Sequence, residues 1–284
     1  MKKYILTLIF LICFPGCVFS NAFVIENNVA IDQRGLNKAE LVYEFRVEGG
    51  MTRFLVFISE GITTEIGPVR SLREVMVDLA EGHKAELVFY GQSPKAGEMI
   101  KNYPFDHVNN ISKVIGIDAE GNKIKKKNFW RVEGYVYEHS LYTSTKLIPV
   151  KNHLRYQTSE NFACEKCSQV NFSFSSVSHV KWIYQNRRYI RKINLKEYQA
   201  DNLVIIRAAI STYDSEGRVV YDLYGKNKVM IFRDGLRLEC EWRRKKGELF
   251  RFFHEGEEIF LKKGTSWIHL PGIMKYDKME LEGE

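Results

Sequence analysis

Residues 71–100 read SLREVMVDLAEGHKAELVFYGQSPKAGEMI and decide the fold of the first half of the chain. Apolar residues recur at intervals of three and four from Leu72 to Leu79, which predicts an amphipathic helix. The apolar run 85–90 predicts a buried strand. The Ser93-Pro94 pair then begins a second helix, because serine caps helix N-termini and proline fits the first helical position.

The residues before this stretch add two strands. Residues 40–45 and 52–59 (TRFLVFIS) are rich in strand-forming side chains, and Gly49 and Gly50 predict a turn between them. Strands that alternate with helices are typical of layered α/β structure. We therefore predict an N-terminal α/β layered domain over residues 21–155.

From about residue 169 onward the pattern is almost entirely β. Short aromatic or β-branched runs are separated by turn residues, among them Asp234-Gly235, a strong signal for a two-residue hairpin, and Glu255-Gly256, a weaker one. This spacing is typical of an antiparallel meander. The predicted fold class is α+β, with a C-terminal antiparallel β-rich domain over residues 165–275.

The first twenty residues predict a secretory signal peptide. Lys2 and Lys3 precede an apolar run of about ten residues, too short for a permanent membrane span, and small or helix-breaking residues follow. Two endings are open. Signal peptidase would cut before Asn21, whereas a lipoprotein signal would end with lipid attached to Cys17. The protein is expected outside the cytoplasm, either tethered to the membrane or soluble.

The charge of the chain is mildly basic. The formal net charge is +7, and removal of Lys2 and Lys3 with the signal leaves 7 − 2 = +5. No nucleic-acid-binding motif is present, and export argues against that partner. The simplest explanation of a mild positive charge is solubility with weak attraction to anionic surfaces. If the charge is functional, phosphate-rich cell-wall polymers are the natural partners, and an envelope protein is the other expected partner.

Three cysteines remain after the signal, namely Cys164, Cys167 and Cys240. The C-x-x-C spacing of the first two allows a short-loop disulfide, a redox pair or half of a zinc site. No second C-x-x-C follows, and the surroundings do not resemble a thioredoxin-like unit. A structural disulfide between Cys164 and Cys167 is the favoured interpretation, with neither a metal nor a cofactor predicted.

Further motifs occur in a set order along the chain: 35–44 (GLNKAELVYE), 47–54 (VEGGMTRF), 66–71 (IGPVRS), 91–94 (GQSP), 129–131 (FWR), 138–143 (EHSLYT), 200–204 (ADNLV) and 264–268 (GTSWI). Together they resemble the YerB-like family of bacterial envelope lipoproteins, over nearly all of the mature chain. The resemblance implies an envelope location and a two-domain build. It implies no particular chemistry, because the family has no assigned activity.

Arginines form the candidate binding site. Arg70 and Arg73 are three residues apart at the start of the predicted helix, where they would share a face beside its N-terminus, a favourable place for an anion. Arg53 would add a third guanidinium, and Gly49-Gly50 would let backbone approach a ligand. Alternatively, Glu44 and Glu48 pair with these arginines inside the fold.

A few other residues are weaker candidates. Arg131 and His139 are the remaining members of the predicted anion-binding set, with Tyr142 as a supporting residue. His139 also offers acid-base chemistry, although a histidine with no partner recognisable in the sequence is more often structural. Ser93 is included as a supporting residue, yet it lacks the surroundings of a hydrolase nucleophile and is explained as a helix cap. The aromatic residues of the second half alternate with charged ones, which predicts a core.

Three functions are compatible with these features. The preferred one is non-catalytic binding of cell-wall material or a wall-associated partner through the arginine-lined site. The alternative is a phosphotransferase acting on pyrophosphate-linked lipid intermediates, by a loose similarity in element order to the LytR-CpsA-Psr enzymes. It requires the three arginines to converge on an open pocket with an acidic residue for magnesium. A third is a redox or metal role for Cys164 and Cys167.

Overall fold

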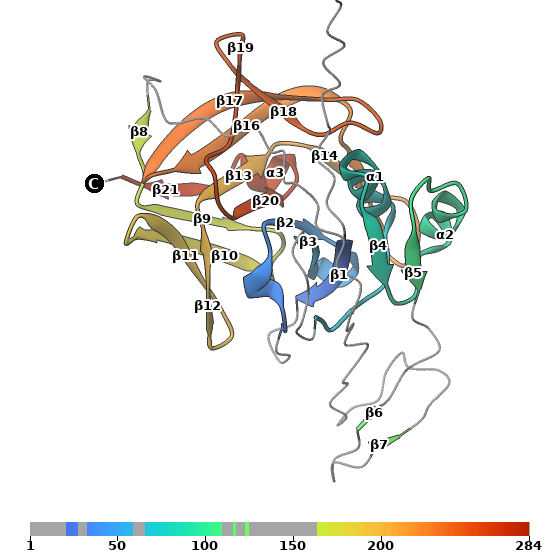
Figure 1. Ribbon diagram of the computed structural model, residues 1–284. Coiled ribbons are helices and arrows are strands. Elements are labelled where there is room, and N and C mark those ends of the chain that lie inside the picture. The colour runs from blue at the N-terminus through green and yellow to red at the C-terminus, as the bar shows by residue number, and fades with distance from the viewer. Residues whose placement is uncertain are drawn as a thin grey trace, which may run out of the picture.

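The computed structural model describes residues 21–27, 33–58, 66–109, 116–117, 123–124 and 164–283. This part of the chain is mostly β (Figure 1). Its helical elements are few, and their bounds are η1 (Leu36–Lys38), η2 (Glu48–Gly50), α1 (Glu74–His83), α2 (Pro94–Ile100) and α3 (Ile273–Tyr276). No helix among these residues is long and apolar enough to cross a membrane.

One large sheet runs through both halves of the chain, in the order β19-β18-β17-β16-β13-β20-β2-β3-β1-β4-β5, with β8 also paired to β17. Its first-half strands are β1 (Asn21–Asn27), β2 (Leu41–Arg46), β3 (Thr52–Ile58), β4 (Glu86–Phe89) and β5 (His107–Asn109). Its second-half strands are β8 (Glu165–Lys166), β13 (Asn202–Ile206), β16 (Gly225–Arg233), β17 (Leu236–Arg244), β18 (Arg251–His254), β19 (Glu257–Ile259) and β20 (Ser266–Leu270).

The two halves join where β20 lies between β13 and β2. Strand β20 is parallel to both neighbours, with Leu41 opposite Ser266 and Phe45 opposite Leu270. The sequence predicts β2, but it predicts neither β20 as a strand nor this pairing. Most of the predicted boundary, residues 155–165, lies outside the described residues, so the division into two domains stays a prediction.

A second sheet of five strands packs against the large one. Its order is β12-β11-β10-β9-β21, with bounds β12 (Lys196–Ala200), β11 (Arg188–Ile193), β10 (His179–Gln185), β9 (Gln169–Ser173) and β21 (Glu280–Glu282). Figure 1 shows it on the side of the molecule away from α1 and α2. The remaining strands form two small hairpins, β14 (Ala209–Thr212) with β15 (Val219–Asp222), and β6 (Gly116–Ile117) with β7 (Lys123–Ile124).

Two hydrophobic clusters cover opposite faces of the large sheet. Along β2, Tyr43 and Phe45 belong to the cluster that includes α1, while Val42 belongs to the cluster that includes Trp182 and Tyr189 of the five-stranded sheet. Alternate side chains of a strand point to opposite faces, so β2 is buried on both. Glu44 shares the second face with Val42, which places a carboxylate between the two sheets.

The predicted cap of the second helix and the predicted Asp234-Gly235 hairpin turn are confirmed. The Ser93 hydroxyl accepts a hydrogen bond from the amide of Ala96 at 3.2 Å and caps α2. Asp234 and Gly235 form the two-residue turn of the β16–β17 hairpin, both with positive φ. Short-range signals of this kind depend on backbone preferences of the residues themselves, which explains why the sequence reveals them.

Candidate ligand-binding groove

Arg70 and Arg73 are each engaged by a carboxylate. Arg70 Nε donates to Glu26 Oε2 at 2.6 Å, and Arg73 donates to both oxygens of Glu48, at 2.6 and 3.0 Å. The expectation that the two arginines share a helix face is wrong, because α1 begins only at Glu74 and Arg73 is its N-cap. The carboxylate of Glu48 thus occupies the fork of Arg73 that the anion-site hypothesis needs.

Arg53 lies beside these ion pairs but has no carboxylate of its own among the described residues. Its Nη1 donates to the carbonyl oxygen of Ser71 at 2.8 Å. Burial, with a further contribution from Arg73, lowers the pKa of Arg53 to about 9 although Glu48 and Glu26 oppose the shift. Arg218 also lies 3.9 Å from Glu48, so four guanidiniums surround the carboxylates of Glu26 and Glu48, and the cluster serves primarily to stabilise the fold.

Of the other predicted site residues, some make contacts within the fold, and the rest lie outside the described part of the chain. The carbonyl oxygen of Gly50 accepts a 2.5 Å hydrogen bond from the Ser175 hydroxyl, so the backbone at Gly50 contacts the segment that contains Ser175. Ser93 also donates to Glu74 Oε1 at 3.0 Å. Four predicted positions lie outside the described residues: Cys17, Arg131, His139 and Tyr142.

The predicted disulfide between Cys164 and Cys167 is not formed in the structure, because both residues are free thiols, as is Cys240. Cys167 is buried in the cluster between the sheets, whereas Cys164 packs against the cluster on the opposite face of the large sheet. Burial raises the pKa of each of these thiols, with that of Cys240 at about 12, which disfavours reactive thiolate.

Glu44 pairs with Arg191, a residue that the site prediction missed. Arg191 Nη1 donates to Glu44 Oε2 at 2.5 Å and Nη2 to Oε1 at 3.2 Å, and the Glu44 side chain is fully buried. Arg191 occupies an inward position of β11, in phase with Tyr189 and Ile193. An arginine in the apolar phase of a strand is the signal that points to a buried ion pair.

Further hydrogen bonds complete the shell of Glu44. Oε1 accepts from Asn27 at 3.1 Å and from the Thr52 hydroxyl at 3.0 Å, and Oε2 lies 3.0 Å from Nδ1 of His269. Trp182 Nε1 donates to His269 Nε2 at 3.2 Å, so the imidazole proton belongs on Nδ1, facing Glu44.

The charges within this buried network are set by its partners. Burial alone raises the pKa of Glu44, but Arg191 and His269 more than offset it and hold that pKa at about 2. Burial lowers the pKa of His269 below its usual value despite Glu44. The network is therefore a carboxylate, a guanidinium and a neutral imidazole, joining β2 to β11 and β20.

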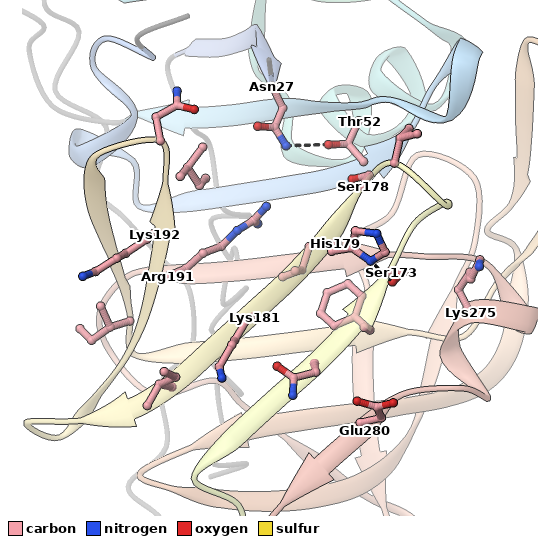
Figure 2. Close-up of a pocket in the computed structure, with 18 of the residues that line it drawn as sticks. Asn27, Thr52, Ser173, Ser178, His179, Lys181, Arg191, Lys192, Lys275 and Glu280 are labelled. Atoms are coloured by element: carbon pink, nitrogen blue, oxygen red, sulfur yellow. Dashed lines mark hydrogen bonds between the residues drawn. The ribbon is translucent and has the colours of Figure 1, made fainter. Parts of the chain in front are cut away.

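An open groove of about 1350 Å³ lies directly outside this network. Asn27, Thr52 and Arg191 line it on one side, and the outward side chains of β9, β10 and β11 form its floor. Figure 2 shows Asn27 and Thr52 hydrogen-bonded at one end, with Lys275 and Glu280 on the opposite side. Arg53, Arg70 and Arg73 do not line this groove.

Lysines give the groove a positive charge. Its lining includes four lysines (Lys181, Lys192, Lys275, Lys278) and two glutamates (Glu197, Glu280), and 4 − 2 leaves +2, with Arg191 already balanced by Glu44. Lys192 lies 3.3 Å from Glu197, with both side chains exposed. The other three lysines make no ion pair within the described part of the chain, so their ammonium groups can bind an anion.

His179 and Ser173 form a cross-strand pair in the groove (Figure 2). His179 Nε2 lies 3.1 Å from the carbonyl oxygen of Ser176, which can only accept, so Nε2 carries the proton. Nδ1 then accepts from the Ser173 hydroxyl at 2.7 Å. No group of three or more potential metal-ligating side chains occurs among the described residues.

Two packed sheets joined across both halves of the chain are also found in a known family of proteins. Residues 20–159 match the family described as "Protein of unknown function (DUF3048) N-terminal domain", and residues 168–268 match the corresponding C-terminal domain. The chain belongs to this family, which is the YerB-like family that its motifs resemble.

Two comparisons with individual proteins agree with this membership. "Putative lipoprotein YerB" of Bacillus subtilis (strain 168) is 27% identical over 278 residues, which cover 88% of this chain and 80% of that protein. A crystal structure of the YerB protein from Bacillus subtilis superposes with a TM-score of 0.74 at 24% identity and covers 94% of each chain. The second comparison establishes a shared fold.

Proposed function

We propose that this protein is a non-catalytic binding protein of the cell envelope and that its ligand is anionic. The groove over the five-stranded sheet is the binding surface, in place of the arginine cluster. The observation that carries the proposal is the set of three lysines, Lys181, Lys275 and Lys278, that face the groove without a carboxylate partner among the described residues. Lysines grouped in a concave surface raise the local concentration of anions.

The arginine cluster is the less suitable binding surface, because most of its guanidiniums already have carboxylate partners. Arg70 and Arg73 have their guanidiniums bound by Glu26 and Glu48. Removing one partner from such a pair is destabilising, so these arginines are poorly placed to exchange a carboxylate for a ligand. The similarity to a lipoprotein and the predicted signal support a place outside the cytoplasm, with lipid at Cys17 as the proposed means of retention.

The test is retention of the purified mature protein on wall sacculi and on membrane vesicles from a bacterium that carries it. We expect retention that falls steeply with salt, as binding of an anion by ammonium groups requires. In the Lys181→Glu/Lys278→Glu variant the apparent Kd should rise about tenfold, since two exposed charges contribute on the order of 0.7 kcal/mol each.

Lys245→Glu/Lys246→Glu provides a matched control, because it makes the same change in net charge at two exposed lysines outside the groove. Both variants should melt at the temperature of the unchanged protein. Equal loss of retention in the two variants would assign binding to net charge alone, and no retention on either fraction would refute the proposal.

A further inference from the structure

The groove is bordered by apolar as well as cationic side chains. Met51, Val177 and Ile183 line it and are 41%, 70% and 41% exposed. Leu195 and Met274, which are 101% and 75% exposed, directly follow and precede the lining residues Asn194 and Lys275. Of the large apolar side chains that are exposed in the described part of the chain, Tyr224 alone lies outside this group.

Exposed apolar side chains gathered around one concavity are typical of a surface that binds another macromolecule. Methionine is enriched at such surfaces, because its flexible thioether adapts to different partners. A ligand made only of phosphate groups would leave these side chains in water. The ligand that fits therefore carries apolar groups beside its negative charges.

The floor of the groove presents a cationic and an apolar side chain on the same face of one strand. On β10, Lys181 and Ile183 point outward two residues apart, and Ile183 is paired across the ladder with Ile190 of β11. Same-face residues of a strand are about 7 Å apart, so Lys181 lies about 7 Å from the apolar pair of Ile183 and Ile190. An extended peptide with a carboxylate two residues from an apolar side chain has the same spacing.

Polar groups of the lining also suit a peptide. Gln185 carries an exposed side-chain amide, which can donate to a carbonyl oxygen and accept from an N–H group of a peptide backbone. The aromatic residue of the lining, Phe172, is only 5% exposed. Sugars are commonly held by exposed aromatic faces, so this lining offers little to a glycan.

The position of the groove favours a partner other than the membrane. Strand β1 runs from Asn21 to Asn27, and Asn27 lines the groove. The two ends of such a strand are about 20 Å apart. Attachment of lipid to Cys17, four residues before Asn21, would therefore hold the membrane at the end of β1 remote from the groove.

We propose that the groove binds an extended segment of another envelope protein in which acidic and apolar residues alternate on one face. This inference rests on the proposed function and names the ligand class of the same site. The lysines bind the carboxylates of the segment, Ile183 and Val177 contact its apolar side chains, and the Gln185 amide binds its backbone.

The test uses fluorescence anisotropy of the mature protein with four probes. They are a twelve-residue peptide with glutamate and leucine on one face, the same peptide with serine for leucine, the same peptide with glutamine for glutamate, and soluble polyphosphate. We expect the acidic and apolar peptide to bind at least tenfold more tightly than any other probe. Comparable affinity for polyphosphate would overturn the inference and leave the proposed function in place.

The Val177→Ser/Ile183→Thr variant separates the apolar contacts from the charge. Both side chains are exposed, and threonine preserves strand preference at position 183, so the fold should be unaffected. Affinity for the acidic and apolar peptide should fall about tenfold while that for polyphosphate changes less than twofold. An unchanged peptide affinity would refute the inference. Failure of every probe to bind, with wall retention also insensitive to the lysine variant, would refute both proposals.

Discussion

Ion pairing decides which arginines of this protein are available to a ligand. The sequence places Arg53, Arg70 and Arg73 near one another and names Glu44 and Glu48 as their alternative partners. The structure pairs Glu48 with Arg73 as considered, but it pairs Glu44 with Arg191, almost 150 residues away. The Glu48–Arg73 pair was considered because the two residues lie in neighbouring segments of the chain. The Glu44–Arg191 pair depends on contact between two sheets, and no local sequence pattern predicts that contact.

The Glu44 network gives the first residue-scale prediction. Glu44→Gln keeps the shape of the side chain but leaves the buried guanidinium of Arg191 without a countercharge. The free energy of unfolding should fall by about 3 kcal/mol, as expected when one partner of a buried ion pair is lost. Urea denaturation at pH 7 measures this. Glu257→Gln, at an exposed position of β19, is the control and should change stability little.

The same carboxylate predicts how stability depends on pH. The pKa of Glu44 is about 2 in the folded protein against 4.5 ordinarily. Its contribution is therefore complete above about pH 4.5 and is lost as the pH falls toward 2, by about 3 kcal/mol in total. Melting curves between pH 7 and 2.5 should show this loss in the unchanged protein and a smaller one in Glu44→Gln. Parallel curves for the two proteins would contradict the assignment.

At the scale of single elements, the predicted strands and helices agree closely with the structure because their signals are local. The predicted strand 52–59 begins with β3 at Thr52, and the predicted strand 85–90 contains β4, Glu86–Phe89. The start of α1 is less well predicted. The helical spacing of its apolar residues begins at Leu72, yet the backbone of Arg73 is extended and the helix begins at Glu74.

The β16–β17 turn allows a prediction at this scale. Gly235 has φ +74°, and a Cβ built there would lie 2.7 Å from Cε1 of Tyr184 in the neighbouring sheet. Gly235→Ala should therefore destabilise the protein by about 1–2 kcal/mol from the backbone, and by more from the displaced ring. Thermal denaturation provides the measurement. Gly217→Ala isolates the backbone component, because Gly217 has φ +73° and nothing within 4 Å of its Cβ position. An equal loss of stability in Gly235→Ala and Gly217→Ala would contradict the predicted clash and show that the Tyr184 ring moves aside without loss of stability.

At the scale of the whole molecule, the two segments recognised as family domains share one sheet and one set of cores. Strand β20 of the second segment pairs with β2 of the first, and Arg191 of the second segment is bound by Glu44 of the first. The composition of each segment predicts its strands, but strand order across the segments depends on contacts between residues far apart in sequence. The groove was missed for the same reason, since β1, β3 and the five-stranded sheet all line it.

Because both segments contribute strands to one sheet, we expect them to unfold together in a single cooperative transition. A fragment of residues 21–163 would expose the edge of β2 that β20 covers, and it would lose the cluster of residues between the sheets. We expect this fragment to show no cooperative melting transition by calorimetry, whereas the intact protein unfolds in one transition. Mixing it with a fragment of residues 164–284 should restore the transition. Independent cooperative melting of either fragment alone would contradict this prediction.

The pairing of β2 with β20 also has a consequence for the proposed export of the protein. Opposed residues in that ladder, such as Leu41 and Ser266, are 266 − 41 = 225 positions apart. A chain threaded through a secretion channel from its N-terminus delivers β2 long before β20. If the chain is exported as proposed, the sheet cannot close until nearly the whole polypeptide has crossed, and folding would be completed on the far side of the membrane, where the chain no longer has to pass through a narrow pore.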